Sequence, residues 1–493
     1  MAKSRYTIQS FYYMQQHSKS RKNRQIKLAT TYGVMTLAVA LISIICILLV
    51  IGYRFNPVKG DLELGSLMQF RSIPSGARIV LDDDPLSFTT PGKRSVAVGE
   101  HTVKMSRSGY QDWQKTFTTD PGELRWVNSA RLIPNDIETK DVFGFPELAS
   151  AMPSPDRKWF LIQTSATQPN FTLVDIRNEE PETAAFSIPA SIYAQSEVPE
   201  GHTFSIVEWD FGSRYALVKH TIAETTEFIV IDRTALDNPE SMVNISSTLS
   251  IALQQVQFSG SSGQSFYGIE NNTLRKLDSD AGTISQPVVR DVASFRLYKT
   301  NTVAYIKQPK DGRIAVGVAV NEKTRQVAEY DDTQPVFVDI NEYFNDTYMA
   351  VSRGAYLGLY KNPDESTARR VASYPLTVTP QWLRMSNSGR FIIAGAATQF
   401  TSYDVETRER FDVNLPGSSI DPTRPLQWID DYHLAVTADN DLRLIEFDGS
   451  NQHVITSTVS NYPVTLSDDG ELLYSLSKVQ DGFALQSSRL ILK

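Results

Sequence analysis

A unit of short strands and polar turns recurs along residues 135–493, and this repeat limits the possible folds more than any other feature of the sequence. Each copy has a short strand, a polar turn, a hydrophobic strand, a second turn and a hydrophobic strand that often ends in Asp. No long amphipathic helical pattern occurs in this region. The eight copies have as their third strands FTLVDI (171–176), FIVIDR (228–233), TLRKLD (273–278), RIAVGVAV (313–320), YLGLY (356–360), FTSYDV (400–405), LRLIEF (442–447) and LQSSRLIL (485–492).

A fourth strand usually follows each copy, as in ARRVASYP at 368–375. Four-stranded repeats of this length are typical of β-propeller blades. A single blade cannot bury both faces, whereas a ring of blades can. The last copy ends at Lys493 without a fourth strand, and IETKDVFGF at 137–145 precedes the first copy without a partner. We therefore expect 137–145 to complete the last blade of an eight-bladed propeller over 135–493; seven blades is the alternative, because the third and fourth copies are degenerate.

A polar turn follows the first strand of each copy. PSPD at 153–156 and SDDG at 467–470 resemble the S-P-D-G-K turn of TolB-like and WD-repeat-like propellers. We assign structural turn positions to Pro155, Asp156, Gly212, Gly263, Gly389, Asp431, Asp469 and Gly470.

An uncharged segment, LATTYGVMTLAVALISIICILLVIGY, lies between Lys27 and Arg54. About 20 helical residues cross a bilayer core, so we predict a transmembrane helix at 28–53. A cleaved signal peptide is the alternative, but the segment is long for one and no A-x-A site follows it. Residues 1–27 hold seven Lys and Arg and no acidic residue. The positive-inside rule then predicts a basic cytoplasmic tail at 1–27, with residues 54–493 outside the membrane.

Residues 54–64 are expected to form a linker, and residues 65–134 a small all-β domain in which strand-like segments alternate with turn sequences such as PSG and TTPG. This segment resembles the PEGA domain family. The residues that carry the resemblance are Pro74, Ser75, Gly76 and Ala77, with Ser where the family name has Glu, and Gly109, Tyr110 and Trp113 of the last hairpin. The resemblance implies a β-sandwich of a prokaryotic surface protein that binds or packs rather than catalyses.

Three consecutive acidic residues, Asp82, Asp83 and Asp84, follow the strand-like segment ARIVLD and precede Pro85. A Ca²⁺ loop needs spaced oxygen ligands, whereas Asp and Pro at the end of a strand favour a turn. We therefore predict a hairpin turn here rather than a metal site.

Other motifs with possible chemistry are weak. Asp210-Phe211-Gly212 spells the kinase DFG motif, but the glycine-rich and H-R-D loops of kinases are absent from the sequence. None of the six histidines has zinc-hydrolase spacing. The pairs Asp430-Asp431 and Asp468-Asp469 fall in repeat turns, and the single cysteine, Cys46, cannot form an intramolecular disulfide. We expect no cofactor, no metal and no catalytic residue.

These observations predict a membrane-anchored, non-enzymatic binding or scaffold protein of the prokaryotic cell envelope. Its partner is expected to be an envelope protein or cell-wall glycan, contacted through the propeller. The net charge of the chain is −8 although its first 27 residues are basic, which argues against nucleic acid. The alternatives are a glycosidase-like envelope hydrolase with carboxylates at the central mouth of the propeller, and a structural subunit of a surface assembly.

Overall fold

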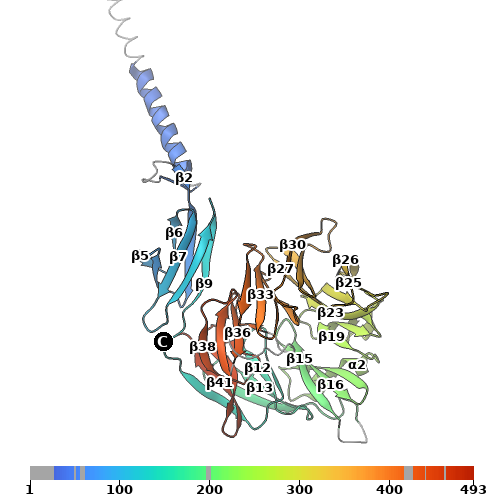
Figure 1. Ribbon diagram of the computed structural model, residues 1–493. Helices are drawn as coiled ribbons and strands as arrows, with labels where there is room; N and C mark the ends of the chain where they lie inside the picture. The colour runs from blue at the N-terminus through green and yellow to red at the C-terminus, as the bar shows by residue number, and fades with distance from the viewer. Residues whose placement is uncertain are drawn as a thin grey trace, which may run out of the picture. The chain divides into compact units, whose positions relative to one another are not determined.

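The computed structural model describes residues 27–48, 52–55, 62–195, 201–415, 426–438, 440–459 and 462–493. The chain divides into two compact units (Figure 1). The first comprises residues 1–107 and 112–132, and the second comprises residues 108–111 and 133–493.

The first unit begins with one apolar helix, Lys27–Leu48, which has the length and composition of a membrane span or a signal sequence. Its 22 residues measure about 33 Å, close to the thickness of a bilayer core. The helix is shorter than the predicted 28–53, because Tyr53 already belongs to a strand and Gly52 has a φ of +101°, in the left-handed region. The predicted linker 54–64 contains most of a strand pair, β1 (Tyr53–Phe55) with β2 (Leu62–Leu64).

The rest of the first unit consists of two sheets. The three-stranded sheet has the order β6-β3-β9 and the four-stranded sheet has the order β5-β4-β7-β8. Alternate residues of the strands are buried, as in Arg78–Leu81, where Ile79 and Leu81 face the core. The strands are β3 (Ser66–Ile73), β4 (Arg78–Leu81), β5 (Asp84–Thr89), β6 (Gly92–Val96), β7 (Gly99–Ser106), β8 (Trp113–Thr119) and β9 (Leu124–Arg131).

The second unit contains eight four-stranded antiparallel sheets, which we number as blades 1–8. Blades 1–4 consist of β11 (Ser150–Pro153), β12 (Trp159–Gln163), β13 (Asn170–Asp175) and β14 (Glu182–Ser187); β15 (Thr203–Trp209), β16 (Tyr215–Ile222), β17 (Thr225–Asp232) and β18 (Val243–Asn244); β19 (Gln255–Phe258), β20 (Ser265–Glu270), β21 (Thr273–Asp278) and β22 (Thr283–Ile284); and β23 (Val292–Tyr298), β24 (Thr302–Lys307), β25 (Arg313–Val320) and β26 (Lys323–Asp331). Two short helical turns, η1 (Pro239–Ser241) and α2 (Ile245–Thr248), lie between β17 and β19.

Blades 5–8 have the same strand order, with one exception in blade 8. Their strands are β27 (Val336–Tyr343), β28 (Asp346–Arg353), β29 (Tyr356–Lys361) and β30 (Arg369–Pro375); β31 (Trp382–Met385), β32 (Phe391–Ala396), β33 (Gln399–Asp404) and β34 (Arg410–Asn414); β35 (Gln427–Trp428), β36 (His433–Ala438), β37 (Asp441–Glu446) and β38 (His453–Ser457); and β39 (Thr465–Leu466), β40 (Leu472–Val479), β41 (Gly482–Arg489) and β10 (Thr139–Phe145).

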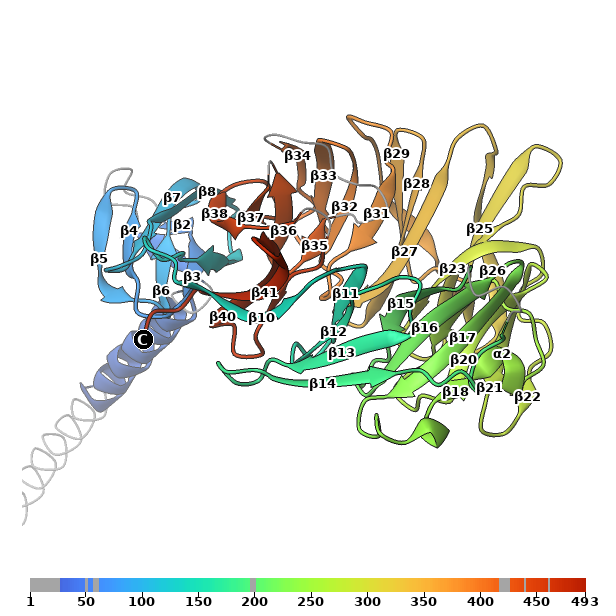
Figure 2. The ribbon, with the colours of Figure 1, turned by 90° about the horizontal axis from the view of Figure 1, so that it is seen from below.

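The exception is that the fourth strand of blade 8 comes from the beginning of the unit. Strand β10 pairs antiparallel with β41, from Thr139 opposite Ser488 to Phe145 opposite Phe483 (Figure 2). The prediction that 137–145 completes the last blade is therefore confirmed, and so is the number of eight blades.

Eight hydrophobic clusters connect each blade to the next. Seven of them join blades 1–8 in sequence, as Leu161 and Val218 do between blades 1 and 2. The eighth joins blade 8 to blade 1 through side chains such as Tyr474 and Phe160. The core thus runs between the sheets around the whole ring, which closes the propeller. The fourth strands β14 and β30 are mostly exposed, so the first strands lie innermost.

Candidate functional site

The acidic triplet forms a hairpin turn, as predicted. Asp82 and Asp83 connect β4 to β5 with φ values of +50° and +66°, and Asp84 already belongs to β5. The Asp82 carboxylate accepts hydrogen bonds from the backbone N–H of Thr102 at 2.8 Å and lies 2.6 Å from Nδ1 of His101. Among the described residues, no group of three or more His, Cys, Asp and Glu could hold a metal ion.

The tetrapeptide Pro74–Ala77 is locked against the turn at Thr90. The N–H of Gly76 donates to the carbonyl of Thr90 at 2.8 Å, and the N–H of Ala77 donates to Oγ1 of Thr90 at 2.9 Å. The hydroxyl of Ser72 donates to the carbonyl of Pro74 at 2.6 Å, whereas Ser75 is exposed. These residues hold two turns together, which is a structural role.

The last hairpin of the PEGA-like segment divides between the two units. Trp113 is buried in the first unit, where its ring lies 6.3 Å from that of Phe117. Gly109, with a φ of +86°, and Tyr110 belong to the second unit, where the Tyr110 hydroxyl accepts a hydrogen bond from the N–H of Leu492 at 2.7 Å.

The turns between the first and second strands of the blades have a shared construction. In blade 8 the hydroxyl of Ser467 donates to Asp469 and accepts the N–H of Leu472 at 3.0 Å. Blade 1 repeats this with Ser154 and Asp156. Gly263, Gly389 and Gly470 have φ values of +70° to +73° in equivalent turns, and Pro155 precedes Asp156 in the turn of blade 1. The assigned turn positions therefore build turns and leave no free carboxylate pair.

The two other acidic pairs are parts of these turns. Asp430 accepts the N–H groups of Tyr432 and His433 and lies 2.8 Å from Nδ1 of His433, while Asp431 is exposed beside it. Lys158 lies 3.9 Å from Asp468. Asp468 and Asp469 have different partners, Lys158 and Ser467, whereas burial and the charge of Asp430 raise the pKa of Asp431. Asp430 itself is used in holding the turn, so both pairs have a structural role.

The DFG sequence forms the corresponding turn of blade 2. Asp210 is fully buried and accepts the N–H groups of Arg214 and Tyr215, both at 2.7 Å. Gly212 packs against the next blade, because a Cβ at this position would lie 2.8 Å from Cβ of Ser261. The left-handed residue of this turn is Ser213, with a φ of +58°. The motif is a structural turn, and its central Phe211 is 68% exposed.

A second aromatic residue is exposed at the same turn of blade 5. Phe344 is 76% exposed at the tip of the β27–β28 hairpin, with a φ of +48°. Bulky residues rarely adopt this conformation, because their Cβ crowds the backbone. All eight first strands occupy the same place in the ring, so their turns lie on one face of the propeller, which we call the Phe211/Phe344 face.

Charged side chains gather on the innermost strands. Glu208 lies on β15, Arg296 on β23, Asp339 on β27 and Arg384 on β31. Burial raises the pKa of Glu208 to about 7 and also raises the pKa of Asp339, and the positive charge of Arg296 opposes both shifts. Burial, together with the positive charge of Arg296, lowers the pKa of Arg384 to about 10. We call these four residues the inner charged cluster.

Both carboxylates of the inner charged cluster connect neighbouring blades. Glu208 accepts the N–H of Phe258 on blade 3, and Asp339 accepts the N–H of Met385 on blade 6 at 2.8 Å. Neutral side chains make the same connection elsewhere, as Gln257 does with Leu297 and Gln427 with Val464, each at 2.9 Å. Since glutamine amides make the same connection in other blades, the main role of the two carboxylates is to accept the hydrogen bonds that join neighbouring blades.

The sequence analysis missed the inner charged cluster, although the repeat carries a signal for it. Glu208, Gln257 and Arg384 each lie two residues before the residue that begins the turn, namely Asp210, Ser259 and Ser386. A polar residue at one fixed position of a short hydrophobic strand indicates a side chain that faces the inside of the ring.

A histidine relay in blade 2 was also missed. Nδ1 of His202 lies 2.9 Å from Nε2 of His220, and Nδ1 of His220 lies 2.9 Å from Oε2 of Glu227. The amide of Asn244 donates to the other oxygen of Glu227 at 2.9 Å. Burial lowers the pKa of His220, against the effect of Glu227. Strand pairing alone brings His220 opposite Glu227, so their separation in the sequence gives no motif.

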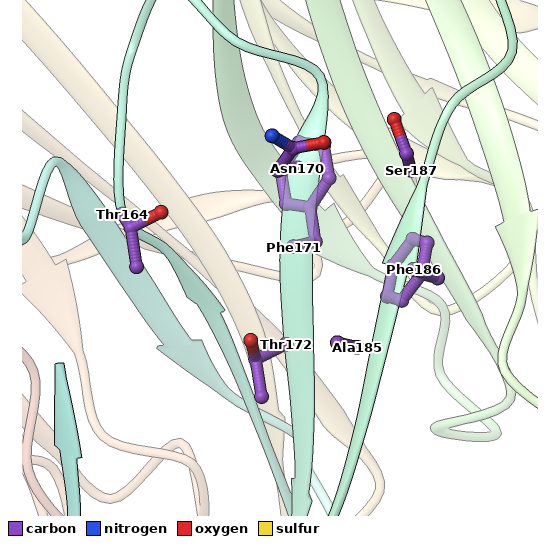
Figure 3. Close-up of a pocket in the computed structure, with 7 residues that line it drawn as sticks. All are labelled: Thr164, Asn170, Phe171, Thr172, Ala185, Phe186 and Ser187. Atoms are coloured by element: carbon purple, nitrogen blue, oxygen red, sulfur yellow. The ribbon is translucent and has the colours of Figure 1, made fainter.

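A hollow of about 360 Å³ lies on the outer strands of blade 1. The rings of Phe171 and Phe186 stack beside it with their centres 5.6 Å apart (Figure 3). Its lining has no charged side chain and consists of Thr164, Asn170, Phe171, Thr172, Ala185, Phe186 and Ser187. Such a lining offers contact surface but no acid, base or nucleophile with a perturbed pKa.

Comparison with known proteins gives a family match for one segment of the chain. The PEGA domain family model matches residues 66–131. No curated protein matches the chain. Similar solved structures include a dihydro-heme d1 dehydrogenase, NirN, in complex with DHE (13% identity, 70% of this chain and 74% of that chain, TM-score 0.45). Others are an oligogalacturonate lyase in complex with manganese (11%, 70% and 99%, 0.37) and Hsv2 of Kluyveromyces lactis (10%, 69% and 98%, 0.40). The propeller assignment rests on the sheet order and the closing strand pair of this chain.

Proposed function

We propose that this protein is a membrane-anchored, extracytoplasmic binding protein of the prokaryotic cell envelope. The helix Lys27–Leu48 holds it in the membrane, with the basic N-terminal tail in the cytoplasm. The PEGA domain acts as a spacer, and the propeller contacts an envelope protein or cell-wall glycan.

The observation that carries this proposal is the pair of exposed rings on the Phe211/Phe344 face. Phe211 and Phe344 are the two most exposed large hydrophobic side chains of the described residues, and both lie at turns between first and second strands. Rings exposed to water add no stability to the fold, and Phe344 also has an unfavourable φ. Aromatic side chains contribute strongly to binding when a partner buries them. The two rings therefore support a binding role for this face.

Hydrolysis is a second candidate, supported by one observation. The pKa of Glu208 is raised to about 7, as the pKa of a general acid in a glycosidase is raised by burial. The hydrogen bonds of Glu208 and Asp339 to neighbouring blades favour a structural use of both carboxylates. Assays of Glu208→Gln and Asp339→Asn on cell-wall glycan separate the two uses, because only a hydrolase loses product formation.

The binding proposal is tested by capture from solubilised envelope and by sedimentation with isolated cell wall. The full chain in nanodiscs is compared with the double variant Phe211→Ser/Phe344→Ser. We expect saturable binding that weakens at least about 30-fold in the double variant, since even one buried aromatic anchor is worth about 2 kcal/mol. Val454→Ser, at an exposed apolar position on the outer strand β38, is the matched control and should bind normally. Equal binding by all three proteins, or no saturable partner, contradicts the proposal.

A further inference from the structure

The PEGA domain has a group of neighbouring apolar side chains that are partly exposed. Strand β3 alternates between buried and solvent-facing side chains, and Leu67 is on the solvent side. The register of β3 with β9 places Leu124 beside Leu67, and Trp126 beside Gln69. These three side chains, Leu67, Leu124 and Trp126, are 36%, 45% and 40% exposed, and we call their surface the Trp126 face.

Backbone hydrogen bonds connect the strands of the Trp126 face to Gly52, which follows the apolar helix in the chain. The N–H of Gly65 donates to the carbonyl of Gly52 at 3.0 Å, and the N–H of Gly122 donates to the carbonyl of Gly65 at 2.9 Å. Gly52 is four residues beyond Leu48, the last described residue of the helix, which is at most about 14 Å of extended chain. Leu124 is two residues beyond Gly122, or about 7 Å along the strand.

These distances place the Trp126 face within reach of the bilayer that would hold the helix. The polar layer on each side of the hydrocarbon core is about 5–7 Å thick, and Trp is enriched there because its ring is apolar and its N–H is polar. The exposed Lys93 is opposite Gln69 on β6, in the same row as Trp126. Arg71 follows on the solvent side of β3. Apolar and basic side chains together match a layer of anionic headgroups.

We propose that the Trp126 face rests on the lipid headgroups next to the anchoring helix and holds the PEGA domain against the membrane. This inference rests on the proposed membrane anchoring. A second copy of the chain or a glycan strand would also cover apolar surface, but the bilayer is favoured because the chain segment that follows the anchoring helix is hydrogen-bonded, through Gly52 and Gly65, to the strands of this face. A short tether also gives the face a high effective concentration at the bilayer, so modest contacts suffice.

Fluorescence quenching by labelled lipids tests the inference. The full chain is placed in nanodiscs of phosphatidylcholine and phosphatidylglycerol with a nitroxide either on the headgroup or at the end of an acyl chain. The chain has six tryptophans, so the difference between the native protein and Trp126→Phe reports Trp126. We expect strong quenching of this difference signal by the headgroup nitroxide and little by the acyl-chain nitroxide.

A second variant separates lipid contact from folding. Leu67→Ser should lower the ratio of lipid-bound to free PEGA domain about tenfold, because the variant loses the apolar surface that Leu67 would bury against lipid. Ile73→Ser removes a similarly exposed apolar side chain from the opposite end of β3, six residues or about 20 Å from Leu67, and should leave quenching unchanged. Unchanged thermal midpoints of both variants show that the domain is folded.

The outcomes are distinguishable. Washing membranes with alkaline carbonate tests the anchoring separately, because it removes proteins that are not inserted in the bilayer. If the protein stays in the washed membrane but the headgroup nitroxide does not quench Trp126, the lipid contact is refuted while the anchoring stands. If the wash extracts the protein, the anchoring itself fails. If quenching changes with the number of protein copies per nanodisc, or cell wall shields Trp126 from a soluble quencher without lipid, a second copy or glycan covers the face and the inference is overturned.

Discussion

Replacement of Glu208 by Gln tests how the inner charged cluster works. Glu208 accepts the N–H of Phe258, and its pKa is raised from 4.5 to about 7 by burial. Gln has the same size and can accept this hydrogen bond, but it has no proton to lose. The variant therefore removes the titration and preserves the connection between blades 2 and 3.

The sign of the pH dependence follows from proton binding. Below pH 4.5 the carboxyl group is protonated in both states, so its contribution to stability is fully present. Between 4.5 and about 7 the folded protein retains a proton that the unfolded chain has released, so stability falls as the pH rises through this window. A shift of this size corresponds to about 3 kcal/mol at pH 8. Glu208→Gln should therefore gain about 3 kcal/mol relative to the native protein between pH 4.5 and pH 8.

Urea unfolding followed by tryptophan fluorescence measures this difference at several pH values. Glu240→Gln, which removes an exposed negative charge in the same blade, serves as the control. The reasoning is refuted if the difference between native protein and Glu208→Gln does not change with pH, or if it changes in the opposite direction.

Three further predictions concern other parts of the chain. Phe160→Ala should cost about 3–5 kcal/mol in urea unfolding, because Phe160 is fully buried where blade 1 meets blade 8; a small loss would contradict ring closure. Native stability should fall as the pH drops below 6.5, because the unfolded chain binds a proton that buried His220 binds less well, and His220→Gln should reduce this slope in pH-dependent melts. Asp82→Asn should lower the free energy of unfolding by about 1–2 kcal/mol through its bond with His101, and so lower the thermal midpoint, whereas Asp83→Asn should not; equal effects would show that only turn geometry matters.

The repeat allowed most of the propeller to be predicted, because each blade is built from local signals. Alternating or continuous hydrophobic strands and Ser- or Asp-led turns mark the blades one by one. The closing strand was predictable for a different reason: the last copy lacked a fourth strand and Thr139–Phe145 lacked a partner. The PEGA domain was recognisable from its turns, but strand β5 was missed, because Asp84 and Pro85 read as part of a turn.

The candidate site was much less predictable than the fold. In the sequence, Phe211 is notable only as part of a kinase-like motif. Its exposure follows from the structure, in which the buried Asp210 holds the turn and Phe211 lies outside the core. The relay of His202, His220 and Glu227 has no fixed spacing: strand register brings His220 opposite Glu227, and His202, just before β15, reaches His220 from the neighbouring strand.

The sequence by itself indicated the apolar helix, the PEGA domain and a ring of seven or eight blades, since each depends on hydrophobic periodicity and turn residues within a short segment; the pairing of β10 with β41 then fixed the number at eight. Only the tertiary structure decided which side chains act together. Glu208 meets Phe258, and Leu67 meets Leu124, because strands far apart in the sequence pair or pack side by side. Burial then decides what those groups can do, as with the raised pKa of Glu208, and burial is a property of the closed ring rather than of any one segment.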